Sequence, residues 1–341
     1  MINLKDLTYD DLKKLVEDMG ESGFRAGQIF AWLHKGVTSI DEMTNLSLEF
    51  RKRLSSAAFV SCPKNLLKRT SKLDGTVKYL FGLADGNCIE TVVMKYNHGL
   101  SVCISTQVGC RMGCGFCAST IGGKQRNLTP GEILDQVIFA SADIGQRISN
   151  IVLMGIGEPF DNYDNVMIFL KNVTDPKGIN IGWRHISLST CGIVPKIKEL
   201  ADMHTQLNLC ISLHAPNDEI RNKIMPVNHK YGVSELMGAA EYYIKQTNRR
   251  ITFEYSLIKG INDKKEHAEE LADLLSGMLC HVNLIPVNRV RERSFEKSSS
   301  VEKFKEVLER RGINATVRRE LGSDISASCG QLRRQQTEKA R

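Results

Sequence analysis

Residues 109–120 read GCRMGCGFCAST and hold three cysteines, Cys110, Cys114 and Cys117, at a CxxxCxxC spacing. Three ligands on one short loop can converge on a single metal centre. A structural zinc ion normally takes four protein ligands, and the sequence offers no second CxxC or HxxxH motif to complete such a site. A four-iron cluster held by three cysteines keeps one iron open to bind another molecule. The spacing therefore favours a catalytic iron–sulfur site.

Strand and helix patterns alternate on both sides of this loop. Strand-like stretches occur at 101–106, 150–154, 185–190, 207–213, 251–257 and 281–285, with helical stretches between them. Parallel strands need such crossovers, so six repeats predict an α/β fold with an open sheet or a partial (β/α)6 barrel. One helix begins with a capping box, formed by Thr129, Pro130 and Glu132. The cysteine loop follows the first strand, at the end where barrels carry their chemistry.

Residues 1–75 differ from this pattern and predict a small N-terminal helical domain. Apolar residues recur at helical spacing in 10–19 and 25–35, and a third helix is expected at 48–57. Cationic residues gather at the end of the segment, either as a solvated face or as an RNA-docking surface: Arg51, Lys52, Arg53, Lys64, Lys68, Arg69 and Lys72. Next comes a hairpin of 77–83 and 88–95 around Asp85-Gly86. We expect the barrel domain at 76–330 and a basic tail at 331–341.

The composition is that of a globular protein in a reducing compartment. The chain has 341 residues, a net charge of +7 and ten cysteines, too few for a disulfide scaffold of this length. The basic excess is compatible with a polyanionic partner such as nucleic acid. No apolar run approaches the roughly 20 residues of a membrane span, and the N-terminus does not read as a signal peptide. We therefore expect a cytoplasmic protein with no membrane partner.

The CxxxCxxC loop in this βα context resembles the radical S-adenosylmethionine (SAM) superfamily. The resemblance implies a 4Fe-4S cluster on Cys110, Cys114 and Cys117, SAM on the open iron, and a 5'-deoxyadenosyl radical made by one-electron cleavage. Residues 154–159, MGIGEP, look like the GGEP segment that receives the amino end of SAM, here through Gly157 and Glu158. Further residues at or just past strand ends are expected to contact SAM, namely Ser189, Ser212, Leu213, His214 and Asn288.

Two cysteines outside the loop indicate which family within the superfamily the sequence resembles. Cys103 lies inside the first strand, and Cys329 lies in the C-terminal stretch 322–332. Together with the N-terminal helices, several stretches resemble the RlmN family: IETV at 89–92, CISTQVGC at 103–110, ISLHAPND at 211–218 and NLIP at 283–286. These bacterial enzymes methylate carbon 2 of an adenosine in 23S ribosomal RNA and, in many members, of an adenosine in transfer RNA.

The resemblance implies a role for each outlying residue. Carbon 2 of adenine is electron-poor and cannot attack the methyl group of SAM directly, so a radical must be delivered. Cys329 would take a methyl group from one SAM as a nucleophile, and the radical from a second SAM would activate it. Cys103 would then release the product by forming a transient disulfide, with Cys103 or Glu90 accepting the ring proton. The family also implies two SAM per turnover and a cellular one-electron donor such as flavodoxin or ferredoxin.

Two alternatives stay open at the level of sequence. The related Cfr type methylates carbon 8 of the same ribosomal adenosine with the same cluster and both cysteines. Gly157-Glu158-Pro159 and Ile285-Pro286-Val287 look more like the carbon-2 enzymes. The other alternative is a noncatalytic RNA-binding protein with a structural iron–sulfur or zinc site. Such a module has no need of the paired Cys103 and Cys329.

Overall fold

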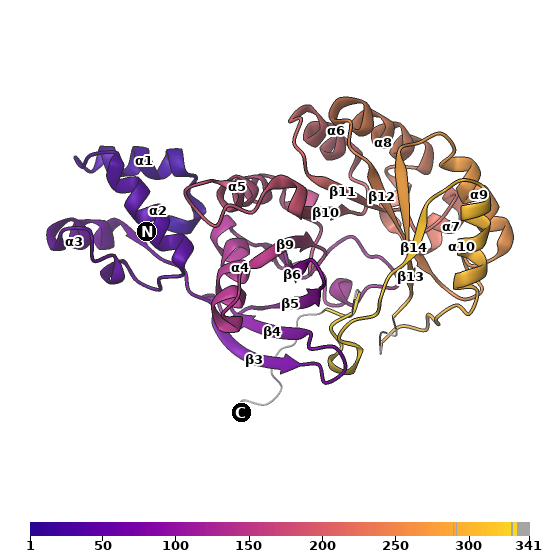
Figure 1. Cartoon of the computed structure of the whole chain (residues 1–341), viewed down its shortest axis with the longest axis horizontal. Coiled ribbons are helices and arrows are strands. Elements are labelled where there is room, and N and C mark those ends of the chain that lie inside the picture. The colour runs from indigo at the N-terminus through magenta and orange to yellow at the C-terminus, as the bar shows by residue number, and fades with distance from the viewer. Residues whose placement is uncertain (289, 291, 329, 333–341) are drawn as a thin grey trace.

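The computed structural model describes residues 1–288, 290, 292–328 and 330–332, and its centre is one curved ten-stranded sheet. Figure 1 shows the sheet wrapping into a partial barrel. Its parallel part runs in chain order through β6 (Gly99–Cys103), β9 (Ile148–Leu153), β10 (Ile186–Thr190), β11 (Asn208–Ser212), β12 (Ile251–Leu257), β13 (Cys280–Pro286) and β14 (Ala315–Val317). The six predicted repeats are confirmed. Strand β14 was not predicted, because three residues are too few to show a pattern.

Helices in the crossovers cover the outside of the curved sheet (Figure 1). They are α4 (Pro130–Ile144), α5 (Tyr163–Thr174), α6 (Val194–Asp202), α7 (Asp218–Ile224), α8 (Val233–Thr247), α9 (Lys265–Leu274) and α10 (Val301–Arg310). The capping box of α4 is confirmed, because the Thr129 side chain accepts a hydrogen bond from the Glu132 backbone N–H. The main hydrophobic core lies between these helices and the strands. This packing fixes the positions of the strands relative to one another, and with them the positions of the strand ends.

Three antiparallel strands extend the sheet on its N-terminal side. They are β3 (Lys64–Thr70), β4 (Val77–Gly82) and β5 (Cys88–Tyr96), and β5 pairs with β6. The hairpin at Asp85-Gly86 is confirmed. Strand β3 lies inside the segment expected to be helical, and all of its residues are exposed. An edge strand with no buried face has no alternating pattern, so the sheet begins before residue 75 without a sequence signal.

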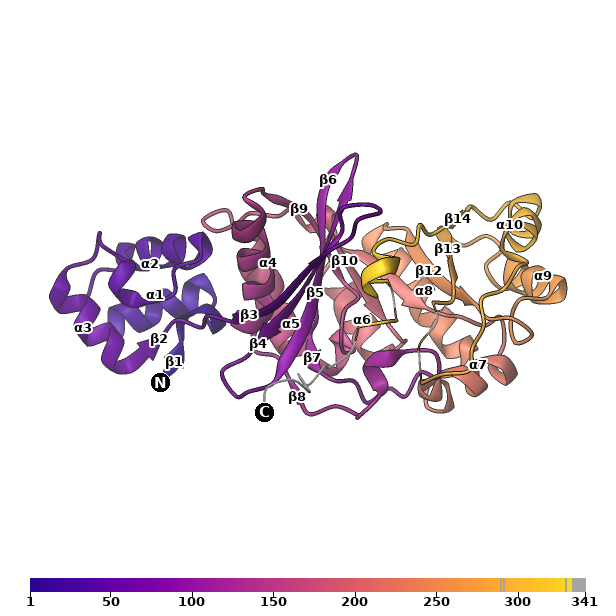
Figure 2. The same ribbon diagram turned by 90° about the horizontal axis from the view of Figure 1, so that it is seen from below.

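The first sixty residues form a separate helical unit beside the sheet (Figures 1 and 2). Helices α1 (Tyr9–Asp18), α2 (Phe24–Lys35) and α3 (Leu48–Ala57) enclose their own core, and β1 (Ile2–Asn3) pairs with β2 (Ala58–Phe59). A buried ion pair joins the unit to α4, with Lys5 Nζ 2.5 Å from Asp135 Oδ1. None of the described helices has the length and apolar run that crossing a membrane requires.

Candidate active site

The cysteine loop is closed by a short antiparallel pair. Strands β7 (Gln107–Val108) and β8 (Arg126–Asn127) join its two ends. Gly109 has φ +77°, and a Cβ there would lie 1.9 Å from the carbonyl oxygen of Gly123. Only glycine fits both the left-handed backbone and this close approach. The left-handed backbone at Gly109 is therefore what allows the loop to pass this close to Gly123.

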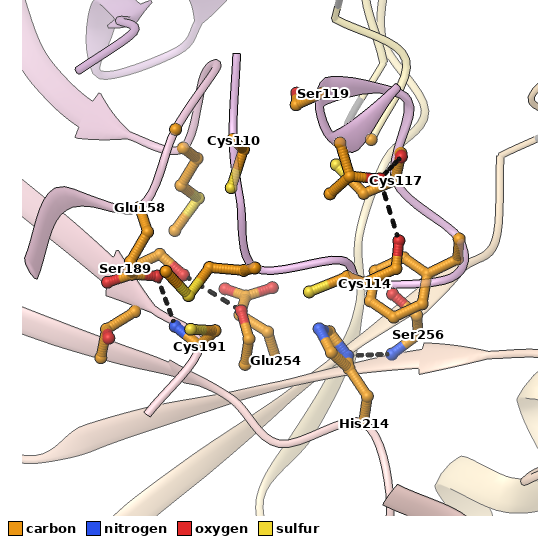
Figure 3. A pocket seen from close by; sticks show the side chains of 18 of the residues that line it. Cys110, Cys114, Cys117, Ser119, Glu158, Ser189, Cys191, His214, Glu254 and Ser256 are labelled. Carbon is orange, nitrogen blue, oxygen red and sulfur yellow. Dashed lines mark hydrogen bonds between the residues drawn. The ribbon is translucent and has the colours of Figure 1, made fainter. Parts of the chain in front are cut away.

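The three cysteines of the loop line one cavity at the carboxyl ends of the strands (Figure 3). The cavity encloses about 850 Å³, its open mouth included. The facing wall comes from the ends of β10, β11 and β12 and carries Ser189, Cys191, Ser212, His214, Glu254 and Ser256. No three His, Cys, Asp or Glu side chains in the described part of the chain converge on one metal-ion position.

The donor set nevertheless suits a thiolate-ligated cluster. Burial raises the pKa of Cys110 to about 12 and that of Cys114 further. Such thiols stay protonated near neutral pH unless a metal supplies positive charge, and metal binding then releases the protons. Three thiols on one wall and polar groups on the opposite wall leave space for a cluster with one open iron.

Glu158 stands on the wall beside the loop and is almost fully buried. Its Oε2 accepts a hydrogen bond from the Cys191 N–H (2.8 Å), and its Oε1 accepts one from the Phe160 N–H (3.1 Å). Burial raises the pKa of Glu158, and these backbone donors oppose the rise. Preceding it, Gly157 has φ +112° and lies against Gln107. The carboxylate is thus held rigidly and can receive an ammonium group from the cavity.

Ser189, Ser212 and His214, which were expected to contact SAM, lie together on the facing wall of the cavity. The hydroxyl oxygens of Ser189 and Ser212 lie 3.4 Å apart on neighbouring strands. His214 Nδ1 accepts a hydrogen bond from the Ser256 N–H (2.9 Å), and burial lowers the pKa of His214 to about 3. A neutral ring that accepts at Nδ1 carries its proton on Nε2. His214 can therefore donate one hydrogen bond from Nε2.

Two predicted SAM contacts lie elsewhere. Leu213 is fully buried in the main core, and its backbone carbonyl accepts a hydrogen bond from Arg221. Asn288 lines a second, adjoining cavity. Neither side chain lines the cavity of the three cysteines. Any contact between Leu213 and SAM therefore has to be made by its backbone.

Glu254 and Arg318 line the cavity and were not predicted. Glu254 is buried, and its Oε2 accepts a hydrogen bond from Asn283 Nδ2 (2.9 Å) and lies 3.6 Å from Arg318 Nη1. Burial raises the pKa of Glu254, and the charge of Arg318 opposes this. Glu254 lies on a strand that was predicted, at 251–257, and a carboxylate within such a strand is a signal from which its place in the cavity could have been predicted. Arg318 follows the unpredicted β14 and carried no signal.

Cys103 lines the second cavity, together with the C-terminal residues Ala327 and Ser328. Among the described residues, four border both cavities: Met154, Ile285, Arg318 and Leu332. Cys329 lies outside the described residues. Its neighbours are placed, since Ser328 lines the second cavity and Gly330 the first. The described residues on either side of position 329 thus border different cavities.

Glu90 is not the solvated hairpin charge that its sequence context alone would indicate. It is 1% exposed on β5 and forms an ion pair with Lys78, with Nζ 2.6 Å from Oε1. Lys78 Nζ also donates to the Ser326 carbonyl (3.0 Å). Val92, two residues along the strand, is paired with Cys103 in the sheet and packs against the C-terminal segment. Glu90 therefore lies on the face of the sheet that this segment covers.

Comparison with known proteins decides the family. Residues 104–275 match the radical SAM superfamily, and residues 2–60 match the N-terminal domain of ribosomal RNA large subunit methyltransferases. A protein of Clostridium novyi named a probable dual-specificity RNA methyltransferase RlmN is 56% identical over 337 residues, 98% of each chain. Its counterpart in Thermoanaerobacter sp. is 58% identical over 337 residues with the same coverage. The chain belongs to the RlmN family.

A solved structure agrees with this assignment to the RlmN family. A radical SAM methyltransferase from Sphaerobacter thermophilus superposes with a TM-score of 0.93 at 43% identity, covering 97% of this chain and 99% of the other. The predicted fold, a radical SAM partial barrel, is confirmed. Membership of the superfamily implies a 4Fe-4S cluster and SAM as cofactors. The chain is thus a radical SAM RNA methyltransferase of the RlmN family.

Proposed function

We propose that the chain methylates carbon 2 of an adenosine in 23S ribosomal RNA, and of an adenosine in transfer RNA, through an S-methyl group on Cys329. The observation that carries this proposal is the position of Cys103. It lines the second cavity beside Ser328, while Gly330 borders the cavity of the cluster cysteines. Cys329 stands between Ser328 and Gly330 in the sequence, and the proposal gives it a role in both cavities.

The cofactors would occupy the first cavity. Cys110, Cys114 and Cys117 would hold the 4Fe-4S cluster, which supplies the electron that cleaves SAM to a 5'-deoxyadenosyl radical. Glu158, with the backbone of Gly157, would hold the amino group of SAM. Ser189, Ser212, His214 and Asn288, with the Leu213 backbone, would bind the remainder. Two SAM would be used per turnover, one for the methyl group and one for the radical.

The outlying residues would handle the methyl group and the proton. Carbon 2 of adenine is electron-poor, so polar methylation fails and the methyl group must arrive as a radical carried on the Cys329 sulfur. Glu90 or Cys103 would accept the ring proton. The adduct formed by radical addition would also give up one electron, which would return to the cluster. Attack of the Cys103 thiolate on the Cys329 sulfur would then form a disulfide and release the methylated base, whose methylene carbon takes the electron pair of the broken C–S bond and a proton. A thiol reductant would reopen the disulfide for the next turnover. The ion pair with Lys78 favours the ionised form of Glu90 that proton acceptance needs.

RNA would be held mostly through its backbone and shape, with one adenosine extruded into the cavity. The N-terminal region expected at residues 1–75 would bind RNA through the cationic residues gathered at its end, from Arg51 to Lys72, while the net charge of +7 belongs to the chain as a whole. The partners are then 23S ribosomal RNA, transfer RNA and a one-electron donor such as flavodoxin or ferredoxin. A Cfr-type carbon-8 methyltransferase is the second candidate, because it would use the same cavities.

The deciding experiment identifies the modified nucleoside. The protein, reconstituted with iron and sulfide without oxygen, is incubated with reductant, methyl-labelled SAM and either unmodified 23S ribosomal RNA or transfer RNA. Mass spectrometry of the digested RNA should find 2-methyladenosine. 8-Methyladenosine as the sole product would contradict the proposal in favour of the Cfr type, and no methylated adenosine with either RNA would contradict both.

Cysteine variants test whether the methyl group passes through Cys329 and whether Cys103 releases the product. Cys329→Ala should carry no S-methyl group and be inactive, whereas Cys103→Ala should accumulate a covalent protein–RNA adduct visible as a shifted band on a denaturing gel. Cys62→Ala is the control, because Cys62 is exposed on the N-terminal side of the sheet. Absence of the adduct in Cys103→Ala would remove Cys103 from the release step.

A further inference from the structure

Arg221 on α7 is a fully buried cation for which the proposed reaction has no use. All of its acceptors are uncharged. Nε donates to the Leu213 carbonyl (3.0 Å), and Nη1 donates to Asn228 Oδ1 (2.8 Å). Nη2 donates to the carbonyls of Cys191 (2.7 Å) and Ser212 (3.1 Å).

No carboxylate among the described residues forms an ion pair with Arg221, although the other buried cations have one. Lys5 pairs with Asp135, and Lys78 pairs with Glu90. The nearby Asp218 is engaged by the Asn228 side chain and the Val233 N–H instead. A charge removed from water without an opposite charge is costly. The four hydrogen bonds and the nearby charge of Asp218 reduce this cost, but no ion pair among the described residues offsets the rest, so a negative group other than a side chain is expected close by.

Arg221 lies directly behind the cysteine loop. The carbonyl of Ile224, the last residue of α7, accepts a hydrogen bond from the Gly115 N–H (2.9 Å). Cys114 packs on a small apolar cluster that contains Cys191 and Ile224. Cys191, whose carbonyl binds Nη2, lines the cavity of the three cysteines.

We propose that Arg221 is the buried countercharge of the iron–sulfur cluster and that it raises the reduction potential of the cluster. The proposal rests on the assignment of the cluster to the three cysteines. Their thiolates make the oxidised cluster negative overall, and reduction adds one electron. The guanidinium stays protonated in both states, so no proton is exchanged. In a low-dielectric surrounding, a fixed positive charge stabilises the more negative, reduced state.

The test is a redox titration of the reconstituted full-length chain, with dithionite as the one-electron source and the reduced cluster followed by electron paramagnetic resonance. Arg221→Gln and Arg221→Met remove the charge. Both should make reduction at least about tenfold less favourable, which is about 59 mV more negative for one electron. Arg221→Lys keeps the charge with fewer hydrogen bonds and should stay close to the wild-type potential.

Asn228→Ala is the matched control, because it removes a hydrogen-bond acceptor of Arg221 and leaves the charge. It should lower thermal stability without moving the potential. A wild-type potential in Arg221→Gln or Arg221→Met, or an equal shift in Asn228→Ala, would show that Arg221 only holds the strand ends together and would overturn the proposal.

A second measurement applies if the neutral variants load too little cluster for titration. Without the cluster, the positive charge of Arg221 has no negative partner that stabilises it. The unfolding temperature of the Arg221→Met apoprotein should therefore be no lower than that of the Asn228→Ala apoprotein. A much lower temperature would assign Arg221 a purely structural role. Neither measurement uses RNA or methyl transfer. If the enzyme proved to methylate another position than carbon 2, both results would stay unchanged. A wild-type chain that binds no cluster would overturn the cluster assignment and this proposal together.

Discussion

The cysteine loop, residues 109–120, and the C-terminal segment, residues 321–332, face each other across the active site but are built differently. The loop is held by its own backbone, for example through the hydrogen bond from the Cys117 N–H to the Cys114 carbonyl (3.2 Å). The C-terminal segment is held by groups far away in the chain. Asp324 accepts from the Lys72 N–H (3.0 Å), and the Gly322 N–H donates to Asp74 (2.8 Å).

The two regions also touch. The Ala118 N–H donates to the Gly330 carbonyl (2.8 Å), and Ser119 Oγ donates to the Leu332 carbonyl (2.8 Å). The loop proposed to generate the radical is closed by its own strand pair and by internal hydrogen bonds, to which contacts with Ile224, Gly330 and Leu332 are added. The part proposed to carry the methyl group is assembled from both ends of the barrel. Changes in the first region should therefore remove the cluster, and changes in the second should spare it.

The largest effect is expected for a thiol of the loop. Cys114→Ala removes one of three ligands, so the variant should bind little iron and transfer no methyl group above background. Iron content and visible absorbance after anaerobic reconstitution measure this. Cys191→Ala is the control, since Cys191 lines the same cavity outside the CxxxCxxC motif. Equal iron in the two variants would contradict the assignment of the loop.

Lys78→Met should affect the second region alone. Breaking the buried pair with Glu90 should lower the free energy of unfolding by about 3 kcal/mol. Because an acid–base group contributes at least about 100-fold to a rate, methyl transfer should slow by about that factor. Denaturant unfolding and single-turnover assays test both. Iron content should match the wild type, and Lys64→Met on exposed β3 should change neither quantity.

Gly109→Ala tests whether the loop is set by its backbone. The added Cβ would lie 1.9 Å from the Gly123 carbonyl, so the loop must shift and cluster loading should fall about tenfold, equivalent to about 1.4 kcal/mol. Gly122→Ala is the control, because Gly122 also has a positive φ (+84°) but nothing within 4 Å of the added Cβ. Similar iron occupancy in both variants would show that the close approach does not matter.

The smallest effect on cluster loading and methyl transfer is expected where the N-terminal unit meets the barrel. His34 Nδ1 accepts a hydrogen bond from the Ile179 N–H (3.2 Å), and burial lowers the pKa of His34 to about 4 from an ordinary 6.5. The unfolded chain therefore binds more protons in this range, and stability should fall as pH drops from 6.5 toward 4.

Unfolding curves at several pH values measure this dependence. His34→Gln should lose this part of the pH dependence, whereas His229→Gln, at an exposed position, should keep it. Identical pH profiles for the wild type and His34→Gln would contradict the prediction.

Sequence patterns predicted the parallel strands and the α4 capping box because these features depend on neighbouring residues. Strand β3 was missed since an exposed edge strand has no buried face, and β14 was missed because it is three residues long. In the candidate site, Ser189, Ser212 and His214 line the cavity of the three cysteines, while their predicted contact with SAM stays a prediction. Leu213 and Asn288 do not line that cavity with their side chains, because strand-end position alone does not say which cavity a side chain faces.

The sequence by itself determined the class of fold and the cysteine loop, because strand periodicity and ligand spacing are properties of adjacent residues. Only the tertiary structure decided which distant groups meet: Lys78 with both Glu90 and Ser326, Cys103 with Ala327 and Ser328, and Arg221 behind the cysteine loop. The physical reason is burial. Whether a charge lies in water or in the interior, and what stands next to it, depends on how the whole chain packs.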